Sequence, residues 1–207
     1  MDKYNVYQDM SRRTGGEIYL GIVGPVRTGK STFIKRFMEL VVIPEMADDN
    51  EKVRTIDELP QSADGKTIMT TEPKFIPKEA AVIHFSNQET GKIRLIDCVG
   101  YLVPEAVGAI EEEKERMVKT PWSEEEIPFS KAAEIGTSKV IREHSNLGLI
   151  ITTDGSFGDI PAVNFEETLQ KTVMECEKAG KPFLILVNTS RPDSQETIQF
   201  TKRLEAQ

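Results

Sequence analysis

GPVRTGKS, at residues 24–31, matches the pattern GxxxxGK[ST] of loops that bind nucleotide phosphates. Such a loop turns backbone N–H groups toward the phosphates at the start of a helix. Gly24 and Gly29 allow the tight turn, Lys30 offers a charge to the β- and γ-phosphates, and Ser31 is the expected Mg²⁺ ligand. The residues that we expect to contact the nucleotide here are Gly24, Pro25, Val26, Arg27, Thr28, Gly29, Lys30, Ser31 and Thr32.

The segments on either side of this loop have the character that a phosphate-binding loop requires. Residues 17–23 (EIYLGIV) read as a buried strand, and residues 31–41 (STFIKRFMELV) read as a helix. The apolar positions of this helix recur at helical spacing and form one face: Phe33, Ile34, Phe37, Met38 and Val41. The order strand, loop, helix therefore predicts an α/β protein of the P-loop NTPase kind.

Composition limits the domain count and the partners. The 207 residues suffice for one α/β domain, which we place at residues 17–207 after an N-terminal segment, 1–16. With 26 Lys and Arg against 34 Asp and Glu, the net charge of −8 predicts no binding to nucleic acid. Cys98 and Cys176 lie in apolar segments without metal-ligand spacing, so we expect reduced core residues of a cytoplasmic protein. No stretch is long and apolar enough to be a signal peptide or a membrane span.

Two strands and a motif for the magnesium site follow in the first half of the chain. Residues 81–86 and 92–98 flank the short loop NQETG, which predicts a hairpin and therefore an antiparallel strand pair. The second strand ends in Asp97-Cys98-Val99-Gly100, a DxxG pattern. Asp97 is placed to hold Mg²⁺, and the N–H of Gly100 is placed to reach the γ-phosphate.

A polar, turn-rich stretch from residue 44 to residue 69 precedes two threonines, Thr70 and Thr71. Nucleotide-sensing proteins place a threonine hydroxyl in such a loop, where it completes the Mg²⁺ shell when the γ-phosphate is present. A solvated turn is the alternative interpretation. Both threonines are candidates for the catalytic role, and Thr71 is a candidate metal ligand.

The residue that follows the DxxG pattern is Tyr101, where many switch proteins carry a glutamine that orients the attacking water. A phenol does not replace that glutamine, so we expect slow intrinsic hydrolysis unless another group positions the water. Residues 101–129 then contain eight glutamates, three basic residues and Trp122. We expect an acidic, solvated insertion at residues 101–129, with a partner-binding surface as the alternative.

The second half of the chain predicts two further helices and two further strands. A helix is expected at 130–144 with Ser130 as N-cap, and another at 164–179 with Asn164 and Glu167 as a capping box. Buried strands are expected at 147–152 and 182–187. A last helix begins at Thr197, and we expect the chain to be the N-terminal part of a longer protein.

The strand at 182–187 is followed by the segment that decides the expected nucleotide. GTP-specific proteins of this kind carry NKxD here, whose aspartate accepts two hydrogen bonds from guanine. This chain has Asn188, Thr189, Ser190 and Arg191, all of which we assign to nucleotide binding. Arginine offers no acceptor, so guanine selectivity is not expected and ATP is the predicted substrate.

Five segments together carry a resemblance to a known family. They are GPVRTGKSTFIKRFMELVVIP, ELPQSADGKTIMTTEPKF, RLIDCVGY, TPW and PFLILVNTSRP. These segments resemble the ATPase domain of the stage IV sporulation protein A family, which acts in morphogenesis of the bacterial spore coat. The resemblance runs along nearly the whole chain.

The resemblance implies a fold, a set of residue roles and a function. The fold would be a three-layer sandwich of the translation-factor-like GTPase class, with a mostly parallel sheet and one antiparallel edge strand. Lys30 would act in the P-loop, Thr70 and Thr71 would sense the nucleotide, and Asp97 would serve the Mg²⁺ site. Hydrolysis of ATP would drive polymerisation into the coat basement layer, in the mother-cell cytoplasm at the forespore surface. Copies of the protein itself and other coat morphogenetic proteins would be partners, and a C-terminal region beyond this chain would contact the forespore membrane.

Three further points stay open at the level of the sequence. Arg27 lies inside the loop and is a candidate for stabilising charge in the transition state, with a surface ion pair as the alternative. A regulatory GTPase that acts on RNA or ribosomes would show the same order of motifs. A small-molecule kinase would use the same loop, but it would normally have an all-parallel sheet and an arginine-rich lid.

Overall fold

The computed structural model describes residues 15–60, 72–84, 90–106, 110–111 and 114–206. Thr70 and Thr71, and the loop at residues 85–89, lie outside the described residues.

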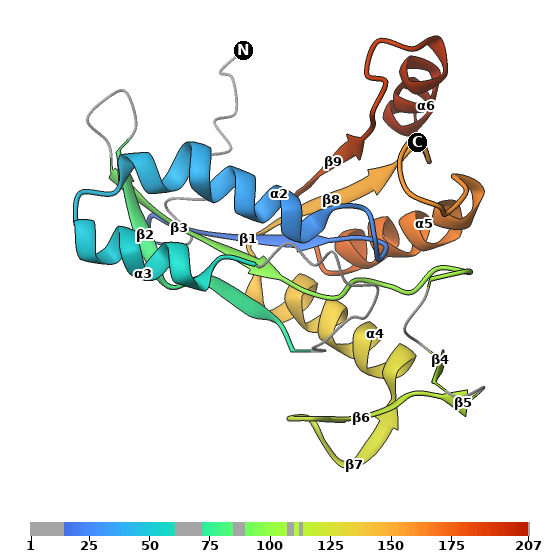
Figure 1. Ribbon diagram of the computed structural model, residues 1–207, viewed down its shortest axis with the longest axis horizontal. Coiled ribbons are helices and arrows are strands. Elements are labelled where there is room, and N and C mark those ends of the chain that lie inside the picture. The colour runs from blue at the N-terminus through green and yellow to red at the C-terminus, as the bar shows by residue number, and fades with distance from the viewer. Residues whose placement is uncertain (1–14, 61–71, 85–89, 107–109, 112–113, 207) are drawn as a thin grey trace.

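A five-stranded sheet forms the centre of the molecule (Figure 1). Its order is β2-β3-β1-β8-β9, in which β1 is flanked by two strands that come later in the chain. All neighbouring strands are parallel except β2 and β3, which pair antiparallel, so the predicted hairpin and antiparallel edge strand are confirmed. The bounds of the strands are Glu17–Val23 (β1), Lys74–His84 (β2), Thr90–Asp97 (β3), Leu147–Thr153 (β8) and Phe183–Asn188 (β9).

The alternation of side chains along the strands builds a core on each face of the sheet. In β1, Leu20 and Ile22 point to one face, whereas Val23 belongs to the cluster on the other. In β8, Ile151 joins the first cluster and Ile150 the second. Ile22, Ile150 and Val23 are fully buried, and burying each such side chain contributes about 1.5–3 kcal/mol of hydrophobic free energy.

The first face is covered by the helix that follows the phosphate-binding loop. Helix α2 (Lys30–Phe37) continues into a π-helical turn, η1 (Met38–Val42), a 3₁₀ turn, η2 (Ile43–Glu45), and then α3 (Asp49–Glu58). Ile34 of α2 and Met38 of η1 are fully buried against the sheet. The expectation of a turn-rich stretch after residue 44 is wrong where α3 forms. Asp48 caps this helix by accepting hydrogen bonds from the N–H groups of Asn50 and Glu51.

The opposite face is covered by α4 (Phe129–Lys139), the π-helical turn η3 (Val140–His144) and α5 (Val163–Lys178). The structure therefore has helices on both faces of the sheet, which makes three layers. Cys98 and Cys176 are buried free thiols in the core of this face, as predicted. Helix α6 (Gln195–Glu205) follows β9 at the end of the sheet (Figure 1).

The two predicted helix caps are wrong. Helix α4 begins at Phe129 with Pro128 at the N-cap position, and the Ser130 hydroxyl instead donates to the Glu115 carboxylate. Helix α5 begins at Val163, one residue before the expected cap, and the Asn164 amide donates to the carbonyl of Pro104 at 3.3 Å. In both cases a tertiary contact takes the side chain that a local capping bond would have used.

The acidic segment at residues 101–129 contains strands that the sequence did not indicate. They form two small antiparallel pairs, and the larger one packs against α4. Glu124, Glu125 and Glu126 are exposed, so this edge of the segment is solvated as expected. Trp122 lies half-buried at the turn of the larger pair. The strands are Ile110–Glu111 (β4), Lys114–Glu115 (β5), Met117–Thr120 (β6) and Ser123–Pro128 (β7).

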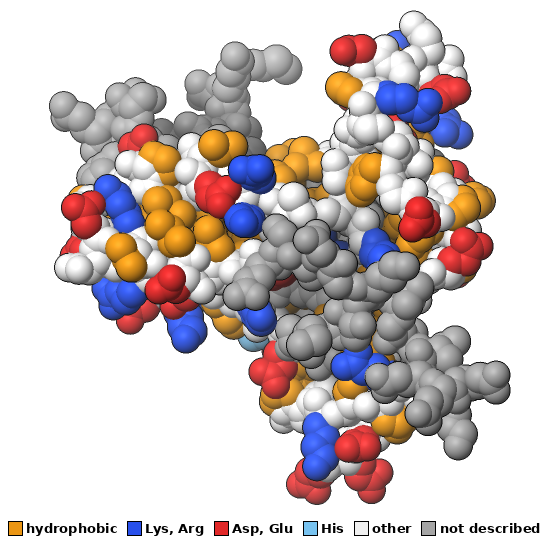
Figure 2. Space-filling view, viewed as in Figure 1, with side chains coloured by type: hydrophobic (Ala, Val, Ile, Leu, Met, Phe, Trp, Pro, Cys, Tyr) orange, Lys and Arg blue, Asp and Glu red, His pale blue; other side chains and the backbone are white. Residues whose placement is uncertain are grey.

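Hydrophobic side chains gather on the surface over α2 and α3 (Figure 2). The exposed large apolar residues of η1 and α3 are Leu40, Val41, Val53 and Ile56. Among the described helices, none combines the length and the apolar character that crossing a membrane requires.

Candidate active site

The predicted phosphate-binding loop joins the carboxyl end of β1 to the first turn of α2. Gly29 is the N-cap residue of α2 and adopts a left-handed conformation, with φ of 91°. A Cβ at this position would lie 2.5 Å from the Asn188 amide nitrogen, which donates to the carbonyl of Thr28 at 3.0 Å. The left-handed backbone favours glycine at this position, and the absence of a Cβ leaves room for the Asn188 side chain at the end of β9.

Lys30 lies inside the loop rather than in solvent. Its side chain is buried, with 5% exposed, and its ammonium donates to the carbonyl of Pro25 at 2.5 Å. Burial lowers the pKa of Lys30, because a charge is costly where water is excluded. An anion bound at the loop would offset that cost, so the position suits a lysine that contacts phosphate.

Ser31 and Asp97, which the sequence assigns to a magnesium site, meet beside this lysine. The Ser31 hydroxyl donates to one carboxylate oxygen of Asp97, Oδ2, at 2.8 Å. The other oxygen, Oδ1, is buried and has no hydrogen-bond partner among the described residues. Burial raises the pKa of Asp97, and the Ser31 bond and the nearby Lys30 charge oppose that shift. A buried carboxylate oxygen without a donor is unusual and suits a cation ligand.

The segment after Asp97 is bound to the phosphate-binding loop through the main chain. The Val26 N–H donates to the carbonyl of Tyr101 at 2.9 Å, and the Tyr101 N–H donates to that of Gly24 at 3.2 Å. Gly100, the residue before Tyr101, has φ of 89°, and a Cβ at this position would lie 2.6 Å from the Lys30 ammonium. The structure thus brings Gly100 to the lysine that the sequence assigned to the γ-phosphate.

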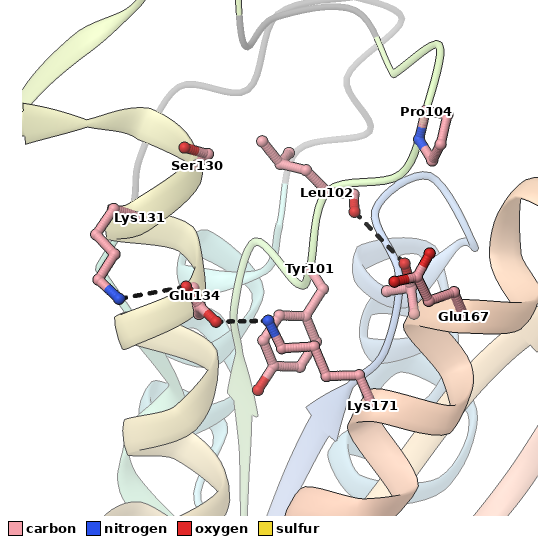
Figure 3. Close-up of a pocket in the computed structure, with 9 residues that line it drawn as sticks. Tyr101, Leu102, Pro104, Ser130, Lys131, Glu134, Glu167 and Lys171 are labelled. Carbon is pink, nitrogen blue, oxygen red and sulfur yellow. Dashed lines mark hydrogen bonds and ion pairs between the residues drawn. The ribbon is translucent and has the colours of Figure 1, made fainter.

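The side chain of Tyr101 points away from the loop, into the space between α4 and α5. It is buried, and its hydroxyl donates to Glu175. The Lys171 ammonium lies 4.7 Å from the centre of the Tyr101 ring (Figure 3). Ser138 also donates to Glu175, at 2.6 Å, and burial raises the pKa of this carboxylate. Tyr101 lines a cavity of about 310 Å³ together with Leu102, Pro104, Ser130, Lys131, Glu134, Glu167, Thr168 and Lys171.

Tyr101→Phe is expected to change stability and to leave hydrolysis nearly unaltered. The variant removes one hydrogen bond to Glu175, which should lower the unfolding free energy by about 1–2 kcal/mol and Tm by several degrees. Because the hydroxyl faces α5, kcat should stay within about twofold. Tyr19→Phe is the matched control, since the Tyr19 hydroxyl also donates to a carboxylate, that of Glu17. A large loss of kcat in Tyr101→Phe alone would contradict this orientation.

The other residues that we expect to contact the nucleotide here differ in their exposure to solvent. Val26 and Thr28 are buried, and the Thr28 hydroxyl donates to the carbonyl of Pro25 at 3.0 Å. Pro25 forms an isolated parallel bridge with Tyr101. Arg27 is exposed and has a left-handed backbone, with φ of 60°, and Thr32 is exposed on α2.

The segment 188–191 adjoins the loop on the side opposite Asp97. Asn188 reaches the loop directly, through its bond to the carbonyl of Thr28. The other three side chains contact neighbouring segments and not the phosphate-binding loop in these bonds. Thr189 donates to Asp154 at 2.6 Å, and Ser190 donates to the carbonyl of Ser156 at 2.9 Å. Arg191 forms an ion pair with Glu196 at 3.6 Å. Their assignment to nucleotide contact stays a prediction.

Two residues of this region were not identified from the sequence. Asp154 follows the strand expected at 147–152, and Glu175 lies within the helix expected at 164–179. Asp154 could have been noticed, because a carboxylate just after a buried strand lies at the edge where ligands bind in parallel sheets. Glu175 carries no such signal, since its partner Tyr101 is 74 positions away in the sequence.

Comparison with known proteins gives a consistent result. The family model described as "Stage IV sporulation protein A, ATPase domain" matches residues 1–207. Stage IV sporulation protein A of Bacillus subtilis (strain 168) is 55% identical over 197 residues, covering 95% of this chain and 40% of the relative. The Bacillus anthracis protein of that name is 53% identical, over 99% of this chain and 42% of the relative. The Clostridioides difficile (strain 630) protein is 49% identical, over 97% and 41%.

Solved structures resemble the chain less closely. A crystal structure of a variant of SsGBP matches with a TM-score of 0.46 and 15% sequence identity, over 96% of this chain and 48% of that one. A likeness at this level does not assign a fold class. The chain spans about two fifths of the length of the curated relatives it matches. The match to the family model and the three relatives together establish that this chain belongs to the stage IV sporulation protein A ATPase-domain family.

Proposed function

We propose that this domain hydrolyses ATP to ADP and phosphate with Mg²⁺, and that its nucleotide state controls self-assembly into the basement layer of the spore coat. The single observation that carries the catalytic part is the group formed by Lys30, Ser31 and Asp97. A buried ammonium, a hydroxyl and a carboxylate lie together where β1 and β3 end beside a helix N-terminus. Membership in the ATPase-domain family supports the same activity.

Mg²⁺ fits the residues at this site. The unpartnered Oδ1 of Asp97 and the Ser31 hydroxyl are hard oxygen ligands, and Mg²⁺ commonly takes only one or two protein oxygens beside phosphate and water. Asp97 and Ser31 would hold the ion, with Thr71 as the further ligand that the sequence predicts. The ion would offset charge on the β- and γ-phosphates.

The residues of the chain divide the remaining work between binding and charge neutralisation. The N–H groups at the start of α2 and the Lys30 ammonium would bind the phosphates, as a loop of this sequence does. Arg27 stays the candidate for additional charge in the transition state. Because the Tyr101 hydroxyl binds Glu175, the residue after the DxxG pattern does not position the attacking water. We therefore expect slow turnover by the isolated domain unless another group, or a partner, positions the water.

The surroundings of Arg191 support ATP rather than GTP. A guanine-selective site needs a carboxylate at this position, but Arg191 is a donor and already pairs with Glu196. A site without the acceptors for guanine loses its means of selecting it. The alternative of a regulatory GTPase acting on RNA is also disfavoured by the net charge of −8.

Assembly, partners and location extend the proposal to the longer protein. The relatives carry the name stage IV sporulation protein A, and this chain spans about two fifths of their length. We propose that copies of the protein itself and other coat morphogenetic proteins are its partners. The site of action would be the mother-cell cytoplasm at the forespore surface, reached through a C-terminal region outside this chain.

Competition between nucleotides tests the proposed substrate. Unlabelled ATP is expected to displace a fluorescent ATP analogue at a concentration about tenfold or more below that of GTP, because one missing base-specific pair changes affinity by 1.4 kcal/mol or more. Phosphate should be released into water without an added acceptor, which separates a hydrolase from a small-molecule kinase. Displacement by GTP at an equal or lower concentration would reverse the nucleotide assignment.

A further inference from the structure

The loops that follow β8 and β9 lie side by side next to the phosphate-binding loop. Thr153 and Asn188 are partners in the parallel register of these strands, so Asp154 and Thr189 follow at the same edge of the sheet. Asn188 connects this edge to the phosphate-binding loop through Thr28. A nucleotide whose terminal phosphate lay beside Asp97, on the β3 side of β1, would extend toward the β8 and β9 side. These two loops would then border the base.

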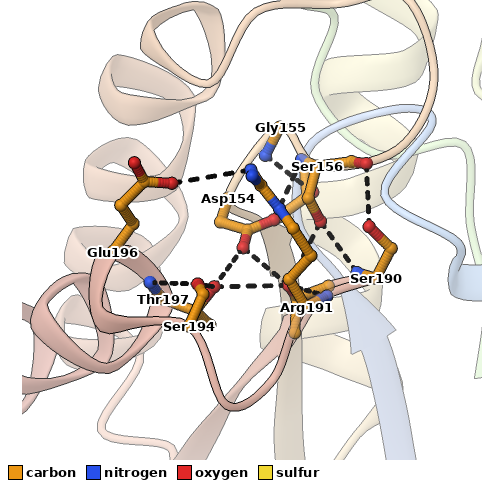
Figure 4. Close-up of polar contacts among 10 residues, drawn as sticks. Asp154, Gly155, Ser156, Ser190, Arg191, Ser194, Glu196 and Thr197 are labelled. Atoms are coloured by element: carbon orange, nitrogen blue, oxygen red, sulfur yellow. Dashed lines mark hydrogen bonds and ion pairs between the residues drawn. The ribbon is translucent and has the colours of Figure 1, made fainter.

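Asp154 joins three segments at this border through one carboxylate. Its Oδ2 accepts hydrogen bonds from the hydroxyls of Thr189 and Thr197, both at 2.6 Å, and its Oδ1 accepts one from the Ser156 N–H at 2.9 Å (Figure 4). Thr189 belongs to the loop after β9, and Thr197 belongs to the first turn of α6. We call Asp154, Ser156, Thr189 and Thr197 the Asp154 cluster.

The cluster fixes the main chain of the segment after β9. The Arg191 N–H donates to the hydroxyl of Thr189 at 3.0 Å, so the same hydroxyl that binds Asp154 also holds the backbone two residues on. Ser190 donates twice to Ser156: its N–H to the Ser156 hydroxyl at 2.8 Å, and its hydroxyl to the Ser156 carbonyl at 2.9 Å. The two loops are thus hydrogen-bonded to each other through Asp154 and Ser156 on one side and Thr189 and Ser190 on the other.

The charge of Asp154 matches this role. Partial burial alone would raise its pKa, but the hydrogen bonds from Ser156, Thr189 and Thr197 outweigh burial and hold the pKa well below its ordinary value. The carboxylate is therefore ionised throughout the neutral range and accepts on both oxygens. Beside the cluster, Arg191 of the loop after β9 forms an exposed ion pair with Glu196 of α6. An asparagine at position 154 would keep the shape but lose one of the two acceptor atoms.

We propose that Asp154 is a positioning residue for nucleotide selectivity, which holds the segment 188–191 in one conformation against the phosphate-binding loop. Asp154 does not itself touch the nucleotide. A carboxylate at position 191 would select the base by direct contact. In this chain, Asp154 gives selectivity indirectly, because it fixes the shape of the base site. This inference rests on the proposed binding of ATP.

Asp154→Asn tests the role through kinetics. KM for ATP is expected to rise about tenfold with kcat within about twofold, because the loss affects binding of the base and not the phosphate chemistry. The preference for ATP over GTP should fall by a similar factor. Asp193→Asn is the matched control, since Asp193 is exposed in the same loop, and its kinetics should equal those of the parent. An unchanged KM and an unchanged preference in Asp154→Asn would overturn the proposal.

Thr197→Val gives the same test if Asp154→Asn does not fold. It keeps the carboxylate and the side-chain shape and removes one donor to Asp154. KM should rise by about threefold to tenfold, as expected for one hydrogen bond to a charged group, again without a matching loss of kcat. A parental KM in a folded Thr197→Val protein would overturn the proposal in the same way.

Amide hydrogen exchange tests the role without nucleotide. In Asp154→Asn, the N–H groups of Ser190 and Arg191 are expected to exchange about tenfold faster than in the parent, while those of the β1 core keep their protection. Unchanged exchange at these two amides overturns the role of Asp154, whichever nucleotide binds. A parent protein that binds no ATP overturns the proposed ATPase function instead, so the two failures are distinguishable.

Discussion

Lys30→Ala is expected to weaken binding of ATP on the order of 100-fold or more, because it removes the buried cation that faces the phosphates. A fluorescent ATP analogue titrated against parent and variant measures the loss. Burial already lowers the pKa of Lys30, so its charge destabilises the fold when no anion is bound. Tm of the variant without nucleotide should therefore be close to that of the parent, which separates lost binding from lost folding.

Lys35→Ala is the matched control for this prediction. Lys35 lies on the same helix, α2, and makes a long i,i+4 ion pair with Glu39, at 4.0 Å. Such pairs contribute about 0.3–0.5 kcal/mol, so ATP binding should not change measurably. Parental affinity in Lys30→Ala would mean that the phosphates do not bind at the loop of residues 24–31.

Asp97→Asn is expected to lower the rate of ATP hydrolysis by about 100-fold or more at a fixed Mg²⁺ concentration. The variant keeps the shape of the side chain but removes the negative charge and one acceptor oxygen, and a metal ion contributes several kcal/mol to such reactions. Phosphate release measured against Mg²⁺ concentration should show a much weaker metal dependence. A chelator such as EDTA should abolish hydrolysis in the parent.

Asp159→Asn makes the same chemical change at an exposed position and should hydrolyse ATP as fast as the parent. Burial raises the pKa of Asp97, so removing its charge should not lower the unfolding free energy without metal. Normal turnover of Asp97→Asn at low Mg²⁺ would mean that another residue carries the metal site.

The parts of the site that are continuous in sequence could be predicted well. The loop of residues 24–31 needs only its own glycines, the strand before it and the helix after it, and all three are present. The DxxG segment was found because it ends a hairpin strand, and the structure pairs that strand with β1 so that Asp97 meets Ser31. Two pieces of information were sufficient to predict these residues: the order of strand, loop and helix along the chain, and the rule that ligands bind at the carboxyl ends of parallel strands.

The parts that depend on contacts between distant segments could not be predicted. Helix α3 has a weak apolar pattern, since Val53 and Ile56 are exposed while Thr55 is the buried residue. The orientation of Tyr101 depends on Glu175, and the conformation of residues 188–191 depends on Asp154, which is 35 positions before Thr189. Such pairs are set by the packing of α4, α5 and α6, for which a single sequence gives no measure.

The two main-chain hydrogen bonds of Tyr101 have a mechanical consequence. Through them, the segments that follow β1 and β3 are joined at the phosphate-binding loop. The ring of the same residue is fixed between α4 and α5. A shift of the chain after Asp97 that kept these bonds would carry the outer helices with it. Product release and a change in the outer surface of the domain would then be a single event.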